Sequence, residues 1–324
     1  MSSRLLWQMA TAAGLALSST GVHPQAYPSK PIRMMIPFPA GGGSDTMGRV
    51  IGQKLAERLG QPVVVENRPG AGGSIGADAV AKAAPDGYTI LLGSTSELVQ
   101  YPNVNPKIGY DPLRDFAPIT LVGTVPLVLV VHPSLPVRTV KDMVALAKAR
   151  PGEINFGSAG NGSTTHLAVE LFILMTGTRM THVPYKGSPQ AVTDLVAGNV
   201  QLGIPTMPAA LGFINAGRAR ALAVTSGRRA PVLPDVPTMQ EAGVLGYETD
   251  LWTGILAPAG TPAAVLSRLH SEIAHITALT DVKDVLGRQG AVPASGTSQE
   301  FSAYMKTELA KWARVVKQAN VRPN

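Results

Sequence analysis

The segment PFPAGGGSD, residues 37–45, follows an apolar run and leads into a helical pattern. A second glycine-rich segment, GSAGNGST at residues 157–164, has the same setting in the other half of the chain. Loops of this kind place bare backbone N–H groups at the positive end of a helix, where they bind anions. Two such loops, one in each half, predict a ligand with two acidic ends that is held from both sides.

A strand, loop and helix pattern repeats around these segments. Strands are expected at 31–37, 62–66 and 88–92, with helices at 46–59 and 74–84. This βαβαβ order predicts a parallel sheet with helices on both of its faces. The same order restarts later in the chain. Its expected elements are strands at 154–156, 180–184, 200–204 and 219–225 and helices at 164–175 and 188–198.

Local signals mark where several helices begin. Thr139 with Asp142, and Thr297 with Glu300, form capping boxes. Ser188 is expected as an N-cap followed by proline at the first helical position. These signals predict helix starts independently of any tertiary contact.

Two apolar segments interrupt the repeat and predict two crossings between domains. Residues 116–131 are too long for one ordinary strand, and residues 251–258 follow a proline-rich loop. We therefore expect an α/β protein of two Rossmann-like domains joined by a two-crossing hinge, an architecture typical of solute-binding proteins. The expected ranges are 27–123 with 251–324 for domain I, and 124–250 for the inserted domain II.

Composition excludes several classes of function. The chain has 324 residues, 45% of them hydrophobic, and a formal charge of +7 that is spread along its length. It lacks the basic stripe with interleaved aromatics that is typical of nucleic-acid binders, so no nucleic-acid partner is expected. There are no cysteines, and the six histidines form no metal-ligand motif, so we expect no metal and no cofactor.

The N-terminus resembles an export signal. Arg4 is followed by an apolar stretch at residues 5–17 that is too short to span a bilayer comfortably. We expect residues 1–26 to be a cleaved signal peptide, with Ala26 as its last residue. The predicted location is therefore the periplasm.

Several longer motifs, taken in order, resemble the Bug proteins, the periplasmic solute receptors of tripartite tricarboxylate transporters. The resemblance covers nearly all of the chain after the signal. The motifs are PFPAGGGSD (37–45), VENRPGAGG (65–73), PDGYT (85–89), HVPYKG (182–187) and LAPAGTP (256–262).

The resemblance implies a type II periplasmic-binding-protein fold and a small carboxylate held in a cleft between two domains. The candidate ligands are a di- or tricarboxylate, an acidic amino acid or an aromatic acid. It also implies membrane transporter subunits as partners, and leaves open the periplasmic domain of a sensor kinase. At residues 203–207, where many relatives carry a polar or acidic residue, this chain has GIPTM. That departure favours a more apolar ligand body.

The candidate contacts come from both glycine loops, from strand ends and from the second crossing. They are Phe38, Pro39, Ala40, Gly41, Gly42, Gly43, Asp45, Ser94, Ser158, Ala159, Gly160, Asn161, Gly162, Ser163, Thr164, His166, Tyr185, Lys186, Pro205 and Trp252.

Four of these candidates have a plain structural alternative. Asp45 is a helix cap by its position, and its charge would repel a carboxylate. His166 lies in a first helical turn, where a surface or packing role is common. Lys186 is alternatively a surface charge, and Trp252 is alternatively hinge packing.

An enzyme is the competing function class. Residues 72–76, GGSIG, match the G-x-S-x-G pattern of hydrolases. A nucleophile at Ser74 would need a sharp turn directly after a strand, and here a loop of Pro, Gly and Ala intervenes. We therefore expect a binding protein, and the alternative is a periplasmic enzyme or sensor partner that acts on the same carboxylates.

Overall fold

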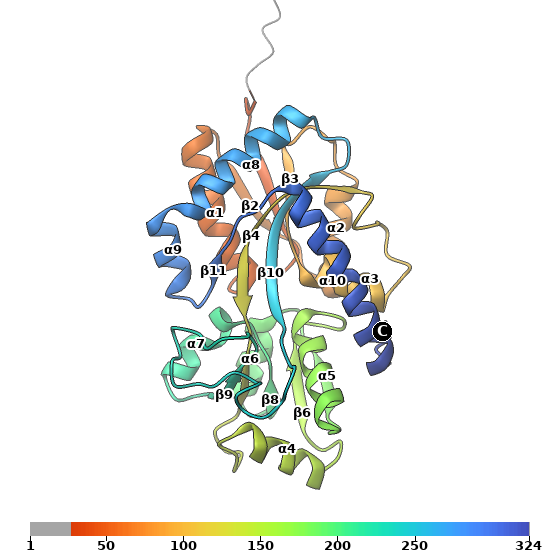
Figure 1. Cartoon of the computed structure of the whole chain (residues 1–324), viewed down its shortest axis with the longest axis vertical. Coiled ribbons are helices and arrows are strands. Elements are labelled where there is room, and N and C mark those ends of the chain that lie inside the picture. The colour runs from red at the N-terminus through yellow and green to blue at the C-terminus, as the bar shows by residue number, and fades with distance from the viewer. Residues whose placement is uncertain (1–26, 324) are drawn as a thin grey trace, which may run out of the picture.

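The computed structural model describes residues 27–323 and shows two β-sheets, one above the other in Figure 1, each flanked by helices. The predicted signal peptide, residues 1–26, lies outside the described residues. Within the described part of the chain, no helix is both long and apolar enough to cross a membrane.

The upper sheet has six strands. Strands β2, β1 and β3 are parallel, as the predicted βαβαβ order requires, whereas β10, β4 and β11 pair antiparallel. The strand order is β11 (Val292–Pro293), β4 (Phe116–Pro126), β10 (Asp250–Pro258), β3 (Thr89–Ser94), β1 (Ile32–Ile36) and β2 (Val63–Asn67).

Helices cover both faces of this sheet because successive strand residues point to opposite sides. Met34 packs in the cluster that contains α1 and α8, and Met35 packs in the cluster that contains α2 and α10. Both side chains are buried. The helices and short turns of this half are α1 (Gly43–Leu59), η1 (Ala71–Gly73), α2 (Ser74–Ala81), η2 (Ser96–Gln100), α3 (Tyr101–Val104), α8 (Ala263–Ala278), α9 (Thr280–Gly287) and α10 (Ser298–Ala319).

The lower sheet has five strands. Strand β6 pairs parallel with β7 and β8, and β5 pairs antiparallel with β8 and β9. The order is β7 (Thr181–Pro184), β6 (Asn155–Ser158), β8 (Leu202–Gly203), β5 (Val128–Val131) and β9 (Arg220–Val224). Its helices are α4 (Val140–Ala149), α5 (Thr164–Thr176), α6 (Ser188–Val196) and α7 (Met207–Asn215).

The two apolar crossings connect the sheets. Residue Leu127 separates β4, in the six-stranded sheet, from β5, in the five-stranded one. Strand β10 brings the chain back and pairs with β4 along its whole length, down to Asp250 opposite Pro126. The predicted first domain boundary, at residue 123, falls inside β4, three residues before its end. The domain ranges themselves remain a prediction.

Local signals placed most helix starts within a few residues. Both capping boxes are confirmed, at Thr139 and at Thr297. Two predicted caps are wrong: α1 begins at Gly43 behind Gly42, and α6 begins at Ser188 behind Gly187. In both cases a glycine with extended backbone occupies the cap position, so the following polar residue enters the first turn.

Thr297→Ala is expected to destabilise the fold by about 1 kcal/mol, because the Thr297 hydroxyl accepts from the Glu300 N–H at 3.1 Å and caps the helix that packs along the six-stranded sheet. Urea unfolding measures the loss. Thr307→Ala, an exposed change in the same helix, is the matched control and should leave stability within about 0.5 kcal/mol. Equal losses in both variants would contradict the capping role.

Candidate functional site

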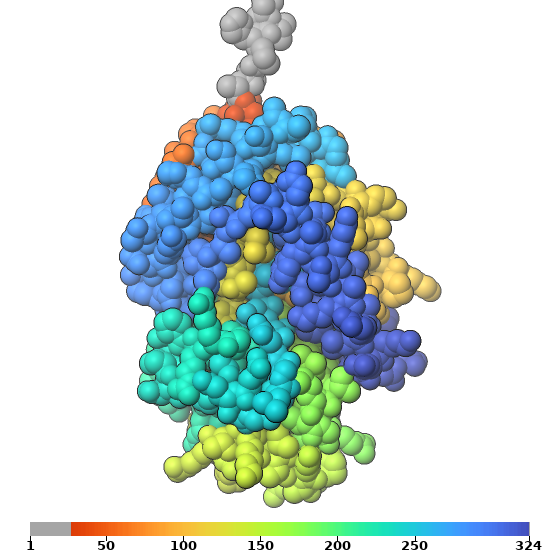
Figure 2. Space-filling view, in the orientation of Figure 1, coloured from red at the N-terminus to blue at the C-terminus, as the bar shows by residue number. Residues whose placement is uncertain are grey.

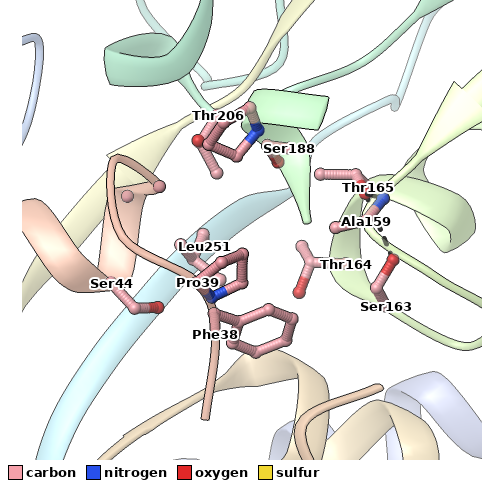
Figure 3. A pocket seen from close by; sticks show the side chains of 13 residues that line it. Phe38, Pro39, Ser44, Ala159, Ser163, Thr164, Thr165, Ser188, Thr206 and Leu251 are labelled. Atoms are coloured by element: carbon pink, nitrogen blue, oxygen red, sulfur yellow. Dashed lines mark hydrogen bonds between the residues drawn. The ribbon is translucent and has the colours of Figure 1, made fainter. Parts of the chain in front are cut away.

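A pocket between the two halves is bordered by both glycine loops (Figure 3). It encloses about 370 Å³ of empty space, including the part that opens to solvent. None of its lining side chains carries a charge. They are Phe38, Pro39, Gly42, Gly43, Ser44, Ala159, Ser163, Thr164, Thr165, Ser188, Pro189, Thr206 and Leu251.

Four helices begin at this pocket. Its lining includes the first residues of α1 and α5, the first residues of α6, and Thr206, the N-cap of α7. The N–H groups of a first helical turn have no acceptor within their own helix. The positive ends of four helix dipoles therefore meet in one place. Such a site attracts an anion without any cationic side chain.

The hydroxyl groups at the pocket differ in their availability. Thr164 Oγ1 donates to Gln100 Oε1 at 2.7 Å, and Thr165 Oγ1 accepts from the Ala159 N–H at 2.7 Å. Thr206 Oγ1 is buried and has no hydrogen-bond partner among residues 27–323. Because an unpaired buried hydroxyl is unfavourable, Thr206 is the side chain that gains most from a ligand oxygen.

Asp45 lies at the first loop but is fully engaged by the protein. Its carboxylate accepts from the Gly41 N–H at 3.0 Å, from Arg49 at 2.9 Å and from Asn67 at 2.9 Å. Partial burial raises the pKa of Asp45, but these hydrogen bonds and the charge of Arg49 outweigh burial and hold it below the usual value. The negative charge is thus neutralised behind the helix start, and the Gly41 amide is not available to a ligand.

A second hollow adjoins the pocket at Phe38 and Ala159. It has about 750 Å³ of empty space, including open solvent, and is also lined by residues 70–73, Tyr101, 160–161 and 184–186. Among these described lining residues Lys186 carries the only charge, and it is exposed. The Tyr185 hydroxyl is taken, since it donates to Asp194 Oδ2 at 2.7 Å.

A larger hollow lies elsewhere, lined by residues of β4, β10 and β11; Figure 2 shows the surface of the molecule on this face. Glu248 and Asp250 line it together with Arg228, Arg229 and Lys283. Burial, and then the charge of Glu248, raise the pKa of Asp250 to about 6, against the opposing effect of Lys311. Charges of both signs therefore line this hollow, together with the C-terminal residue of α9, Gly287, whereas the pocket at the glycine loops has no charged side chain.

The family model described as the tripartite tricarboxylate transporter family receptor matches residues 47–321. The chain belongs to this receptor family. It is 41% identical over 314 residues to Protein BugT of Bordetella pertussis, which covers 95% of this chain and 96% of that protein. The resemblance to Bug proteins, the expected α/β two-domain fold and the expectation of a binding protein instead of an enzyme are thereby confirmed.

Solved structures agree with this assignment. An R. palustris protein solved with adipate has a TM-score of 0.89 and 39% identity, and covers 92% of this chain and 100% of its own. The periplasmic binding protein BugD has a TM-score of 0.87 and 34% identity, with 91% and 99% coverage. MatC from Rhodopseudomonas palustris, with bound malate, has a TM-score of 0.84 and 30% identity, with 90% and 100% coverage.

The predicted contact residues of this receptor divide into three groups. Seven line the charge-free pocket, and others line the adjoining hollow or a small one behind the second loop, where Ser158 and Pro205 lie. The third group borders none of these three hollows. Its members are Ala40, Gly41, Asp45, Ser94, Gly162, His166 and Trp252.

Ser94 is held away from the pocket by a buried acid. Its hydroxyl donates to Glu97 Oε2 at 2.7 Å, and its N–H donates to the same carboxyl group. Glu97 is fully buried, which raises its pKa to about 7 even though the Ser94 bonds oppose the shift. Both polar groups of Ser94 are thus engaged by this acid, and Ser94 borders none of the three hollows.

Trp252 is hinge packing, the alternative that the sequence left open. Its ring lies 5.7 Å from Phe301 and 5.6 Å from Tyr304, both on α10. In β10, Leu251 points to the opposite face and reaches the pocket instead. Leu251 and Trp252 face opposite sides because neighbouring side chains alternate along a strand.

Gly162 and His166 are also structural. A Cβ atom at Gly162 would lie 2.7 Å from Tyr101 Cδ2, so the loop packs directly on that ring. His166 is 4% exposed, and its Nδ1 accepts from the Gly162 N–H at 3.0 Å. Neither residue presents a group to the pocket.

Sequence reasoning missed the starts of α6 and α7 as parts of the site. Thr206-Met207-Pro208 carries a usable signal, since a threonine cap with proline in the first turn is typical of a helix start. From the sequence, residues 203–207 were interpreted only as favouring a more apolar ligand body. The structure adds that Thr206 brings a hydroxyl to the pocket.

Gly187→Ala is expected to weaken ligand binding strongly without unfolding the protein. A Cβ atom there would lie 2.2 Å from Pro39 Cγ across the cleft, while the backbone of Gly187, at φ 174°, suits any residue. The methyl group would thus keep the two halves apart. Small-angle scattering should show a larger radius of gyration.

Gly212→Ala is the matched control for this test, because a Cβ atom there meets nothing within 4 Å. It should retain both compactness and binding. A Gly187→Ala protein as compact as the control would contradict the contact between the halves.

Proposed function

We propose that this receptor captures a small carboxylate, with a dicarboxylate as the preferred class, in the pocket between its two halves. The observation that carries the proposal is the meeting of four helix N-termini at a pocket without charged side chains. Oriented amides and hydroxyls bind a carboxylate through charge-assisted hydrogen bonds, which are strong in a site that excludes water.

The proposed binding mode uses both hollows. One carboxylate accepts from the first-turn amides of α1 and α5 and from Thr206, and the ligand body lies against Phe38. A second carboxylate reaches the mouth of the cleft near Lys186. The solved relatives with adipate and malate support a dicarboxylate, since each of those two acids has two carboxyl groups.

The setting of the activity follows from the family. We propose that the protein works in the periplasm and delivers its ligand to the membrane subunits of a tripartite tricarboxylate transporter. The family description names a transporter and no kinase, so the sensor-kinase domain is not carried into the proposal. Residues 27–123 with 251–324, and 124–250, are proposed as the two domains that close on the ligand.

A calorimetric panel of adipate, malate and hexanoate tests the ligand class. At least one dicarboxylate should bind at micromolar or lower concentration, and hexanoate should bind at least tenfold more weakly, because it lacks the group that reaches Lys186. The acids should be recovered unchanged. Tight binding of hexanoate alone would overturn the dicarboxylate assignment, and product formation would overturn the receptor function.

Thr206→Val tests the pocket itself. Loss of a hydrogen bond to a charged group removes about 1.5–3 kcal/mol, so the affinity for the bound acid should fall roughly 10- to 150-fold. Stability should stay equal or rise, because the change removes an unpaired buried hydroxyl.

Thr249→Val is the matched control, since Thr249 also buries an unpartnered hydroxyl but borders none of the three hollows around the glycine loops. It should bind as the wild type does. Equal affinity of Thr206→Val and Thr249→Val would place the carboxylate elsewhere.

A further inference from the structure

The second glycine loop lies against a stack of three rings. The rings of His166 and His182 are 3.7 Å apart between centroids and only 8° from parallel. Phe156 lies against both imidazoles, with its ring centroid 4.9 Å from that of His182 and 6.0 Å from that of His166. These rings come from α5, β7 and β6, so the stack joins three separate elements beneath the loop.

Each imidazole holds a different part of the loop. His166 Nδ1 accepts from the Gly162 N–H at 3.0 Å, and His182 Nε2 lies 2.6 Å from Ser158 Oγ. Ser158 Oγ in turn accepts from the Gly160 N–H at 3.1 Å. Ser158, Gly160 and Gly162 are therefore held by the histidine pair, directly or through the Ser158 hydroxyl.

These contacts define the tautomer of the neutral His166 ring. A nitrogen that accepts from a backbone N–H carries no proton, so the His166 proton is on Nε2. That nitrogen faces Glu170 Oε1 at 3.3 Å, and the carboxylate favours this tautomer. A proton added to Nδ1 would oppose the Gly162 N–H and break the bond.

We propose that His166 and His182 are positioning residues of the ligand site. As a neutral stacked pair they hold residues 158–163 in the conformation that presents the start of α5 to the pocket. Proton uptake by the pair releases both the loop and the ligand. The inference rests on the proposed function, because the loop matters only if the pocket binds the acid. It adds that the protonation of these histidines regulates the ligand affinity of that site.

The surroundings of His182 oppose its protonation. Burial, and then repulsion from a charged His166, lower the pKa of His182 to about 3 from its ordinary value of 6.5. Among residues 27–323, Glu170 is the charged side chain within ion-pair distance of these two rings, and it contacts His166 and not His182. Phe156, the third ring, brings no charge.

The sign of the pH effect follows from that depressed pKa. The neutral form of His182 is favoured in the ordered loop, so its contribution is complete above pH 6.5. It is lost progressively as the pH falls from about 6.5 toward 3. Binding linked to one proton should weaken by up to tenfold for each pH unit below 6.5.

The test compares adipate and malate affinities between pH 7.5 and 5.5 in variants that keep the acceptors but cannot titrate. His166→Asn with His182→Gln places amide groups where Nδ1 and Nε2 lie. This double variant should bind within about threefold of the wild type at pH 7.5 and lose the excess pH dependence. Protonation of the acid itself affects both proteins equally and cancels in the comparison.

Two single variants complete the set. His166→Leu removes the acceptor for Gly162 and should bind at least tenfold more weakly at pH 7.5, with urea unfolding showing that it folds. His275→Asn, at an exposed site on α8, should keep the wild-type pH profile. A double variant with the wild-type pH slope, or a folded His166→Leu protein with wild-type affinity, would overturn the proposal.

A measurement without ligand separates this inference from the proposed function. Nitrogen-15 NMR of the histidine side chains should show His166 as the Nε2–H tautomer at pH 7.5, and the Gly162 amide signal should change together with the imidazole signals on acidification. A His166 protonated at Nδ1 would refute the positioning role even if neither acid bound. If His166 is the Nε2–H tautomer but neither acid binds, the positioning role stands and the ligand assignment is wrong.

Discussion

The amide groups at the starts of α1, α5, α6 and α7 need acceptors that their own helices do not supply. All four starts border one pocket that contains no charged side chain. A carboxylate is the natural acceptor for such a set, because each helix end also carries partial positive charge. The rest of the site is consistent with this constraint. Glycine lies where the backbone approaches closely, and small hydroxyl residues lie beside the amides. The charge of Asp45, in the first turn of α1, is neutralised by Arg49 and hydrogen-bonded by Asn67.

The hinge explains how groups from two sheets can form one pocket. Strands β4 and β10 pair with each other throughout the six-stranded sheet, and β4 continues through Leu127 into the five-stranded one. Leu251 on β10 faces the pocket, while Trp252 faces α10. Movement about this strand pair would therefore alter the pocket on one side and the packing of α10 on the other, so ligand capture and hinge packing share a single element.

Several residues that were predicted as ligand contacts do not reach the pocket, because they are hydrogen-bonded to other protein groups behind the loops. Ser94 satisfies the buried Glu97, and His166 with His182 supports the second loop. In both places a polar residue close to the ligand site in sequence is committed to another buried polar group. Leaving that group unpaired would be more unfavourable than losing one of several donors to a ligand. The sequence thus pointed to both glycine loops that border the pocket, but not to which nearby polar side chains are committed to other buried groups.

Local chemistry by itself determined the two glycine loops, the capping boxes at Thr139 and Thr297, and the βαβαβ order, because each depends on residues within a few positions of one another. Only the tertiary structure decided that α6 and α7 also begin at the pocket, since this depends on the strand order β7-β6-β8-β5-β9. It likewise decided that Leu251 and not Trp252 faces the ligand site, and that His166 stacks on His182. Those outcomes come from side chains far apart in sequence competing for the same buried space, which no local pattern records.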